Sequence, residues 1–141
     1  MLINCTNHPY EIWNDPQREA SKQYGEVLDV PFPAIDPDAE SDELRKLAAL
    51  YAAKIEEQKP EAVVVAGEFT FAFMLVDKLL QDGVRVLATC SKRITEEVKN
   101  TDGSNEKRTV FIFERFREYE YYNNSIAKEN TSERQQKWKE N

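Results

Sequence analysis

Short apolar runs alternate with longer amphipathic segments as far as Cys90. The runs predict strands at Leu2–Cys5, Glu26–Val30, Ala62–Ala66 and Val84–Cys90. Segments with helical spacing separate these runs, and they cover Pro16 to Tyr24, Ser41 to the residues before Pro60, and Thr70 to Gln81. Because strands that alternate with helices are joined by right-handed crossovers, this order predicts a parallel sheet covered by helices.

The pattern changes after Cys90. Ile94–Val98 and Arg108–Phe116 look like strands, and they flank the turn signal Asn100–Ser104. We therefore expect an α/β, Rossmann-like fold, with a four-stranded parallel sheet flanked by helices and an antiparallel hairpin added at one edge. The domain is predicted to span residues 1–118. Residues 119–141 are predicted to form a polar C-terminal tail, with a frayed helix near Glu133 to Lys139.

The predicted helix from Thr70 to Gln81 is apolar around most of its circumference. Packing against a sheet uses one face of a helix, and apolar residues such as Phe73 and Met74 exceed that need. Large exposed apolar patches mark association surfaces. The surplus therefore predicts a homodimer.

Composition narrows the class of protein. The 141 residues carry a net charge of −7, which argues against a duplex nucleic-acid binder with a broad basic face. No apolar run is long enough for a membrane span, and the first residues lack the features of a signal peptide. Cys5 and Cys90 lie far apart, which favours reduced thiols and a cytoplasmic location. No cofactor is expected, and two cysteines with one histidine predict no metal site.

Polar residues follow three of the predicted strands. In an open parallel sheet, ligands bind beyond the carboxyl ends of the strands, beside the point where strand order reverses. If the order is 2-1-3-4, that point lies between the first and third strands. The residues expected to line one cleft there are Asn7, His8, Gly67, Thr70, Ser91, Lys92 and Arg93.

Each of these residues has a chemical role and a structural alternative. Lys92 and Arg93 are cations suited to phosphate, while Ser91 and the amides after Gly67 are neutral donors. Asn7 is suited to orienting a ligand, and an imidazole such as His8 exchanges protons near neutral pH.

The alternatives are structural. The His8 ring can bind a backbone carbonyl where the strand ends, and Asn7 can form an Asx turn. Lys92 and Arg93 can be a solvated pair at the start of the hairpin. Glu68 opposes an anion after Gly67 unless it pairs with Lys92 or Arg93.

The segment Leu2–Pro9 resembles the first strand of small CRISPR-associated ring-nuclease-like proteins, which are relatives of the Rossmann-like CARF sensor domains. The similarity extends over about residues 1–95. It implies a homodimer that binds a cyclic oligoadenylate across a two-fold cleft. It also implies either sequestration of the ring or metal-independent opening, in which a ribose 2′-hydroxyl attacks the adjacent phosphate.

Carried over by position, the resemblance places Asn7 and His8 at the ligand and Ser91, Lys92 and Arg93 near phosphates. The catalytic candidates are His8, Ser91 and Lys92. The chain departs from the pattern in its acidic charge, in Glu68, and in the hairpin and tail.

Two functions follow from these patterns. The first is binding of a phosphorylated nucleotide-type ligand, with cyclic oligoadenylate as the suspected ligand and with turnover left open. The alternative is a non-catalytic interaction or regulatory protein that self-associates and has no small-molecule site. A nucleotide site requires Lys92 and Arg93 to face the cleft beside Asn7, whereas the alternative lets them point into solvent.

Overall fold

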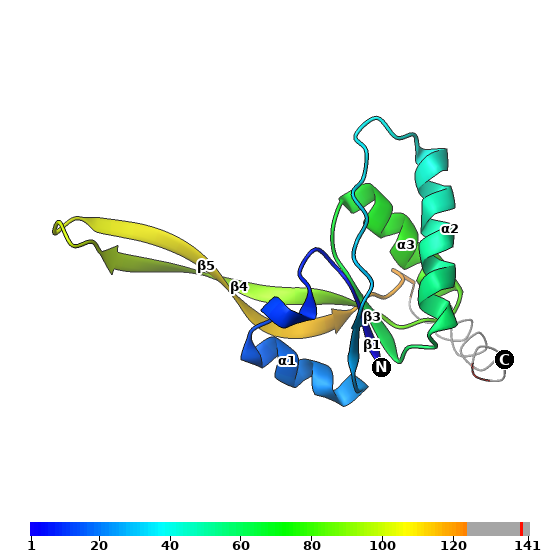
Figure 1. The fold of residues 1–141 in the computed structure, drawn as a ribbon, viewed down its shortest axis with the longest axis horizontal. Coiled ribbons are helices and arrows are strands. Elements are labelled where there is room, and N and C mark those ends of the chain that lie inside the picture. Colours follow the sequence, from blue (N-terminus) through cyan, green and yellow to red (C-terminus); the bar gives the residue numbers. More distant parts are fainter. Residues whose placement is uncertain (124–138, 140–141) are drawn as a thin grey trace.

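A five-stranded mixed sheet forms the centre of the molecule. The computed structural model describes residues 1–123 and residue 139. The strand order is β2-β1-β3-β4-β5 (Figure 1). The strands are β1 (Leu2–Cys5), β2 (Val27–Asp29), β3 (Ala62–Val65), β4 (Val86–Lys99) and β5 (Asn105–Glu118). Neighbouring strands are parallel as far as β4, and β5 is antiparallel to β4. The α/β class is therefore confirmed, with an antiparallel pair at one edge.

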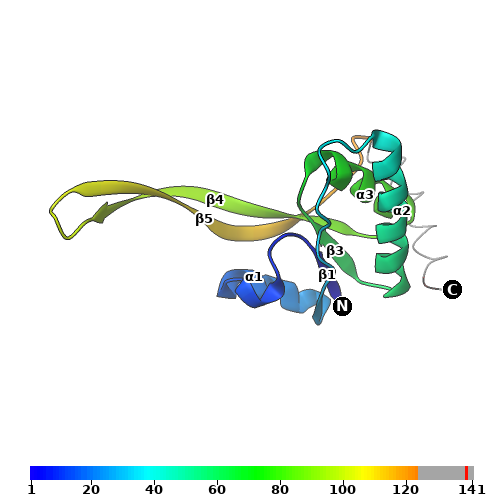
Figure 2. The same ribbon diagram turned by 45° about the horizontal axis from the view of Figure 1, so that its top comes forward.

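Helices cover both faces of the sheet. The helices are α1 (Asp15–Ser21), α2 (Ser41–Glu57) and α3 (Phe69–Gln81), with short 3₁₀ turns at Tyr10–Ile12 and Lys22–Tyr24. In Figure 2, α2 and α3 lie on one side of the sheet and α1 lies on the other. The start of α1 is capped by Asn14, whose side chain accepts from the Gln17 amide.

Side chains alternate between the two faces of the sheet and build two cores. On the face of α2 and α3, Ile3, Val63 and Val86 pack with Phe71 and Leu75. On the face of α1, the buried set consists of Leu2, Trp13, Ala62, Val64, Leu87, Phe113 and Phe116. The central strands β1 and β3 are thus buried on both faces, as expected for a sheet covered on both sides, whereas the edge strand β2 is largely exposed.

The β4–β5 hairpin extends far beyond the rest of the sheet (Figure 1). β3 pairs with β4 only at Val86 and Leu87, whereas β4 and β5 stay paired as far as Lys99 and Asn105. The turn between them is closed by the Asn100 amide donating to the Ser104 carbonyl. We call residues 91–113 the arm. The arm leaves the sheet at the carboxyl ends of the parallel strands.

This continuity corrects the predicted strand count. Val84–Cys90 and Ile94–Val98 were expected to be separate strands, but they belong to the single strand β4. The sheet therefore has five strands, where the sequence predicted six.

A β-bulge lies where the arm begins. Cys90 pairs with Arg115, but the next residue, Ser91, pairs with Phe113, so Glu114 has no partner residue on β4. The extra residue places Phe113 and Phe116 on the same face, with ring centroids 5.0 Å apart. Both rings can therefore pack in the core beneath α1.

The outer face of α3 is apolar and exposed. Phe71, Leu75, Val76 and Leu79 are buried, whereas Phe69 and Phe73 are 89% and 75% exposed. Phe73 belongs to the surplus noted in the sequence and Phe69 adds to it, whereas Met74 is half-buried against the core.

Two sequence-based predictions concern the rest of the chain. Within the described residues, every helix is too short or too polar to cross a membrane. The tail helix expected near Glu133 to Lys139 lies outside the described residues, apart from Lys139 itself.

Candidate functional site

The strand order puts the reversal point between β1 and β3. A side chain fills the space there: Phe32 from the proline-rich loop after β2 is buried against Gly67. A β-carbon at Gly67 would lie 2.4 Å from Cε1 of Phe32, so only glycine leaves room for the ring. Phe32 also packs edge-on against Phe71, with centroids 5.3 Å apart. Gly67 is therefore a packing residue as well as the start of a turn.

A hydrogen-bond network shapes the loop after β1. The buried Asn4 amide donates from Nδ2 to the His8 carbonyl oxygen (2.8 Å) and to Oδ1 of Asp29 (2.9 Å). The Thr6 hydroxyl lies 2.8 Å from Oδ1 of Asn4 and accepts from the His8 amide at 3.1 Å. Trp13 also donates from Nε1 to the His8 carbonyl, at 3.0 Å. The backbone of His8 is thus held from several sides.

This network leaves two predicted site residues facing solvent. The side chains of Asn7 and His8 are exposed, while the backbone between them is fixed. The His8 carbonyl is an acceptor in the network. The expected alternative was a His8 ring bonded to a backbone carbonyl, whereas these hydrogen bonds are made by the His8 backbone. Asn4, Thr6, Asp29 and Trp13 were missed as site-shaping residues, although a polar Asn4 inside an apolar strand was an available signal.

A cavity of about 260 Å³ lies beside this loop. It is lined by Asn4, Thr6, Asn7, Pro9, Asp29, Pro31 and Phe32. Asn7 is the one predicted site residue in that lining. The Asp29 carboxylate also accepts from the Tyr10 amide at 3.2 Å, so its charge is partly used within the fold.

The start of α3 already holds an anion from the chain itself. The Glu68 carboxylate caps the helix and accepts from the amides of Thr70 (3.1 Å) and Phe71 (2.8 Å). It also accepts from the Thr70 hydroxyl at 2.7 Å. These hydrogen bonds, above all the one from the Phe71 amide, lower the pKa of Glu68. The donors expected after Gly67 and at Thr70 are therefore occupied by Glu68.

Ser91, Lys92 and Arg93 do not follow the end of a strand. They lie inside β4, at the base of the arm, opposite Phe113, Ile112 and Phe111 respectively. The expectation that they form a strand tip is wrong, because β4 continues with β5 as its pairing partner beyond the edge of the parallel strands.

Side chains alternate between the two faces along β4, so Ser91, Lys92 and Arg93 do not all lie on one face. Leu87 faces α1, so Ser91 and Arg93 share the side of Asn4 and Thr6, whereas Lys92 faces the side of α3. Lys92 lies 3.3 Å from a carboxylate oxygen of Glu114. Arg93 lies directly across the hairpin from Phe111, which is 68% exposed. The α1 side of the arm thus presents a guanidinium beside an open aromatic ring.

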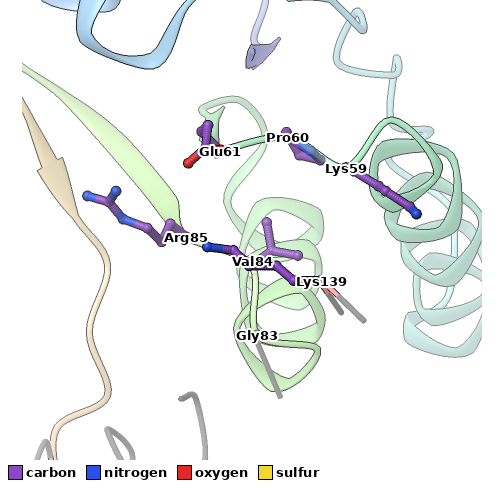
Figure 3. A pocket seen from close by; sticks show the side chains of 7 residues that line it. All are labelled: Lys59, Pro60, Glu61, Gly83, Val84, Arg85 and Lys139. Atoms are coloured by element: carbon purple, nitrogen blue, oxygen red, sulfur yellow. The ribbon is translucent and has the colours of Figure 1, made fainter. Parts of the chain in front are cut away.

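Other hollows lie away from this edge. One of about 390 Å³ is formed where β3 and β4 begin. Its lining includes Lys59, Arg85 and Lys139, and the side chains of Lys59 and Arg85 point in different directions (Figure 3). Arg85 is paired with Glu118, with Nε 2.6 Å from Oε1. Cys5 is an inert core residue, because burial raises the pKa of its thiol to about 12.

The comparisons with known proteins show the family of the chain. The model of the uncharacterized protein MJ1673 family matches residues 1–117, which include the parallel strands and the whole arm. No curated protein and no solved structure matches the chain. With the match covering most of its length, the chain belongs to the uncharacterized protein MJ1673 family.

Proposed function

We propose that this protein is a Rossmann-like nucleotide binder that takes a phosphorylated ligand, with cyclic oligoadenylate the suspected one, at the carboxyl edge of its parallel strands. The observation that carries the proposal is the pairing of Arg93 with Phe111 on the side of the arm that also faces the β1 loop. A guanidinium binds phosphate through charge-assisted hydrogen bonds, and an exposed aromatic ring stacks on a base.

The loop after β1 supplies the remaining groups. Asn7 and His8 are exposed on a backbone fixed by Asn4, Thr6 and Trp13, which suits them to contact a ligand without reorganising. Ser91 shares the face of Arg93 and adds a neutral donor. Lys92 lies on the opposite face beside Glu114, so the requirement that both cations face Asn7 is not met, and the proposal rests on Arg93 without Lys92.

Ring opening is the reaction that such a site would perform. The ribose 2′-hydroxyl attacks the adjacent phosphorus, the bond to the 5′-oxygen breaks, and a 2′,3′-cyclic phosphate forms. This step moves one proton from the attacking to the leaving oxygen. His8 is the residue that we assign to that transfer.

Binding is tested by thermal shift and calorimetry with cyclic and linear oligoadenylates and with mononucleotides. A ligand that binds the native state raises the melting temperature. Arg93→Ala should weaken binding about ten- to a hundred-fold, the effect of one charge-assisted contact. Phe111→Ala should weaken it by a similar factor through lost stacking. Arg108→Ala, farther along the arm and on its other face, is the matched control and should bind normally.

Turnover is tested separately. If the native protein opens the ring, His8→Ala should slow that reaction by about 10²–10⁴-fold while binding is retained. A melting temperature that no nucleotide of the panel raises would overturn the binding proposal, and the self-associating interaction protein would then be the better account.

A further inference from the structure

β4 has a long edge that no other strand of the described chain covers. β3 pairs with it only at Val86 and Leu87, so between Ala88 and Lys99 its strand partner is β5 alone. Such an edge exposes a row of backbone donors and acceptors that can pair with another chain. A two-stranded ribbon without further cover is only marginally stable in water. A third strand on this edge would therefore stabilise the arm.

The charges along this edge would pair favourably with those of an identical strand that runs in the opposite direction. Lys92 and Arg93 precede Ile94 and Thr95, and Glu96 with Glu97 follow them. When the same sequence lies alongside in antiparallel orientation, the basic half of each strand meets the acidic half of the other. Opposite charges across strands stabilise a sheet, and like charges destabilise it. The pattern fits a second copy of this chain.

Symmetry restricts the register of such a pair. Directly opposed residues of antiparallel strands point to the same face, so the two-fold axis must pass through a residue position. An axis at Ile94 places Ile94 opposite itself, Lys92 opposite Glu96 and Thr89 opposite Lys99. This register uses nearly the whole free edge and stops short of the residues that β3 occupies.

The neighbouring registers are poorer. An axis at Arg93 sets two guanidinium groups directly opposite each other, which is destabilising. An axis at Thr95 leaves Thr89 and Cys90 unpaired and sets Ile94 opposite Glu96. Charge therefore disfavours the axis at Arg93. The axis at Thr95 would pair Arg93 with Glu97, so strand length and the contact of Ile94 with Glu96 are what disfavour it.

An apolar row crosses the face of the arm at the same position. Ile94 is 37% exposed and lies opposite the half-buried Val110 within the hairpin. Pairing about Ile94 would continue this row as Val110, Ile94, Ile94 and Val110 across four strands. The contact would remove apolar surface from water at the centre of the interface.

We propose that two copies of this chain join the free edges of their β4 strands, antiparallel about Ile94, into one four-stranded sheet. The partner is thus a second copy, and the surface is the arm instead of the exposed face of α3. The proposal does not depend on a ligand.

Sedimentation velocity of the full chain at tens of micromolar tests the interface. The native protein should be a dimer. Lys92→Glu and Glu96→Lys should each raise the dissociation constant at least about ten-fold, since each reverses one member of two symmetric pairs. An equimolar mixture of the two variants should restore a dimer, because acidic positions of one variant then face basic positions of the other.

The mixture distinguishes an effect of the two substitutions on the interface from an effect within one hairpin. Lys92 lies near Glu114 and Glu96 lies opposite Arg108 in the same chain, and damage to those pairs persists on mixing. Arg108→Glu is the matched control and should leave the dimer intact. In a Cys90→Ser background, Ile94→Cys should form an intermolecular disulfide under mild oxidation, whereas Val110→Cys should not.

Three results would overturn the proposal. The first is a native protein that sediments as a monomer at tens of micromolar. The second is a mixture of the two charge variants that stays monomeric. The third is a dimer that resists both charge variants but dissociates with Phe69→Asp and Phe73→Asp, because the interface would then lie on α3.

Discussion

Asn4 is a polar residue inside an apolar strand, and its partners explain why it is tolerated there. It is 1% exposed, donates to Asp29 and the His8 carbonyl, and accepts from Thr6. Without its amide, the His8 carbonyl and the Asp29 carboxylate each lose a donor in a partly buried hydrogen bond, and such losses are costly. The shape of the β1 loop therefore depends on this one side chain.

Asn4→Ala should lower the free energy of unfolding by about 2–3 kcal/mol, through lost hydrogen bonds and a small cavity. Urea denaturation followed by circular dichroism measures the change. Asn7→Ala, three residues away but exposed, is the control and should stay within about 0.5 kcal/mol of the native protein. Equal effects of the two substitutions would contradict the network.

The close contact between Gly67 and Phe32 provides a second test at the scale of single residues. Gly67→Ala should destabilise the fold by about 1–3 kcal/mol, because the new β-carbon would overlap the Phe32 ring. Phe32→Leu should remove most of that penalty, so a double-mutant cycle should give a coupling free energy of about 1 kcal/mol or more. Strictly additive effects would show that the two residues do not press on each other.

At the scale of elements, α2 and α3 meet through a carboxyl pair. Burial, together with the hydrogen bond and negative charge of Asp82, raises the pKa of Glu56 to about 8, whereas Lys78 opposes the shift. The folded state thus binds a proton that the unfolded chain releases near its ordinary pKa of 4.5. The stabilisation is complete below that value and is lost as the pH rises through about 8.

Glu56→Gln should therefore flatten the fall in stability between pH 5 and pH 9. Because Glu56 is partly solvated, the difference from the native protein should reach only about 1–2 kcal/mol at high pH. Melting temperatures across that pH range measure it. The neighbouring Glu57→Gln, at an exposed position, should keep the native pH profile. Parallel profiles for native protein and Glu56→Gln would rule out this titration.

The elements that could be predicted from the sequence are those whose apolar pattern reflects packing in a core. Helical spacing located α2 and α3, a short apolar run located β1, and a continuous β-branched run located β3, because these patterns arise from packing against a core. The continuity of β4 could not be predicted in this way. Ser91, Lys92 and Arg93 lie outside the core, so their strand is held by pairing with β5 and needs no apolar pattern. The position of the cationic candidates was missed for the same reason.

At the scale of the whole molecule, the core and the arm are separable. Both buried clusters consist of residues outside the span from Lys92 to Ile112. Replacing that span with a two-residue Asn-Gly turn should keep Ser91 opposite Phe113 and preserve cooperative folding. The free energy of unfolding should change by no more than about 1 kcal/mol.

Urea denaturation at low protein concentration measures this change, and size-exclusion chromatography reports the state of association. The shortened chain should unfold in a single transition and elute as a monomer. A chain that no longer folds cooperatively would show that the arm contributes to the core.

Glu114, the extra residue of the bulge, shapes the base of the arm. Phe113 and Phe116 are three positions apart, so strict alternation without a bulge would put them on opposite faces of β5. Deleting this one residue would make the ladder regular, because Phe113 would stay opposite Ser91 and Phe116 opposite Thr89, so both rings would keep their face. Arg93 and Phe111 would also keep their side, but the arm would lose the bend and the added twist of the bulge and would leave the sheet in another direction. The direction in which a long ribbon presents its chemistry thus depends on a single inserted residue at its root.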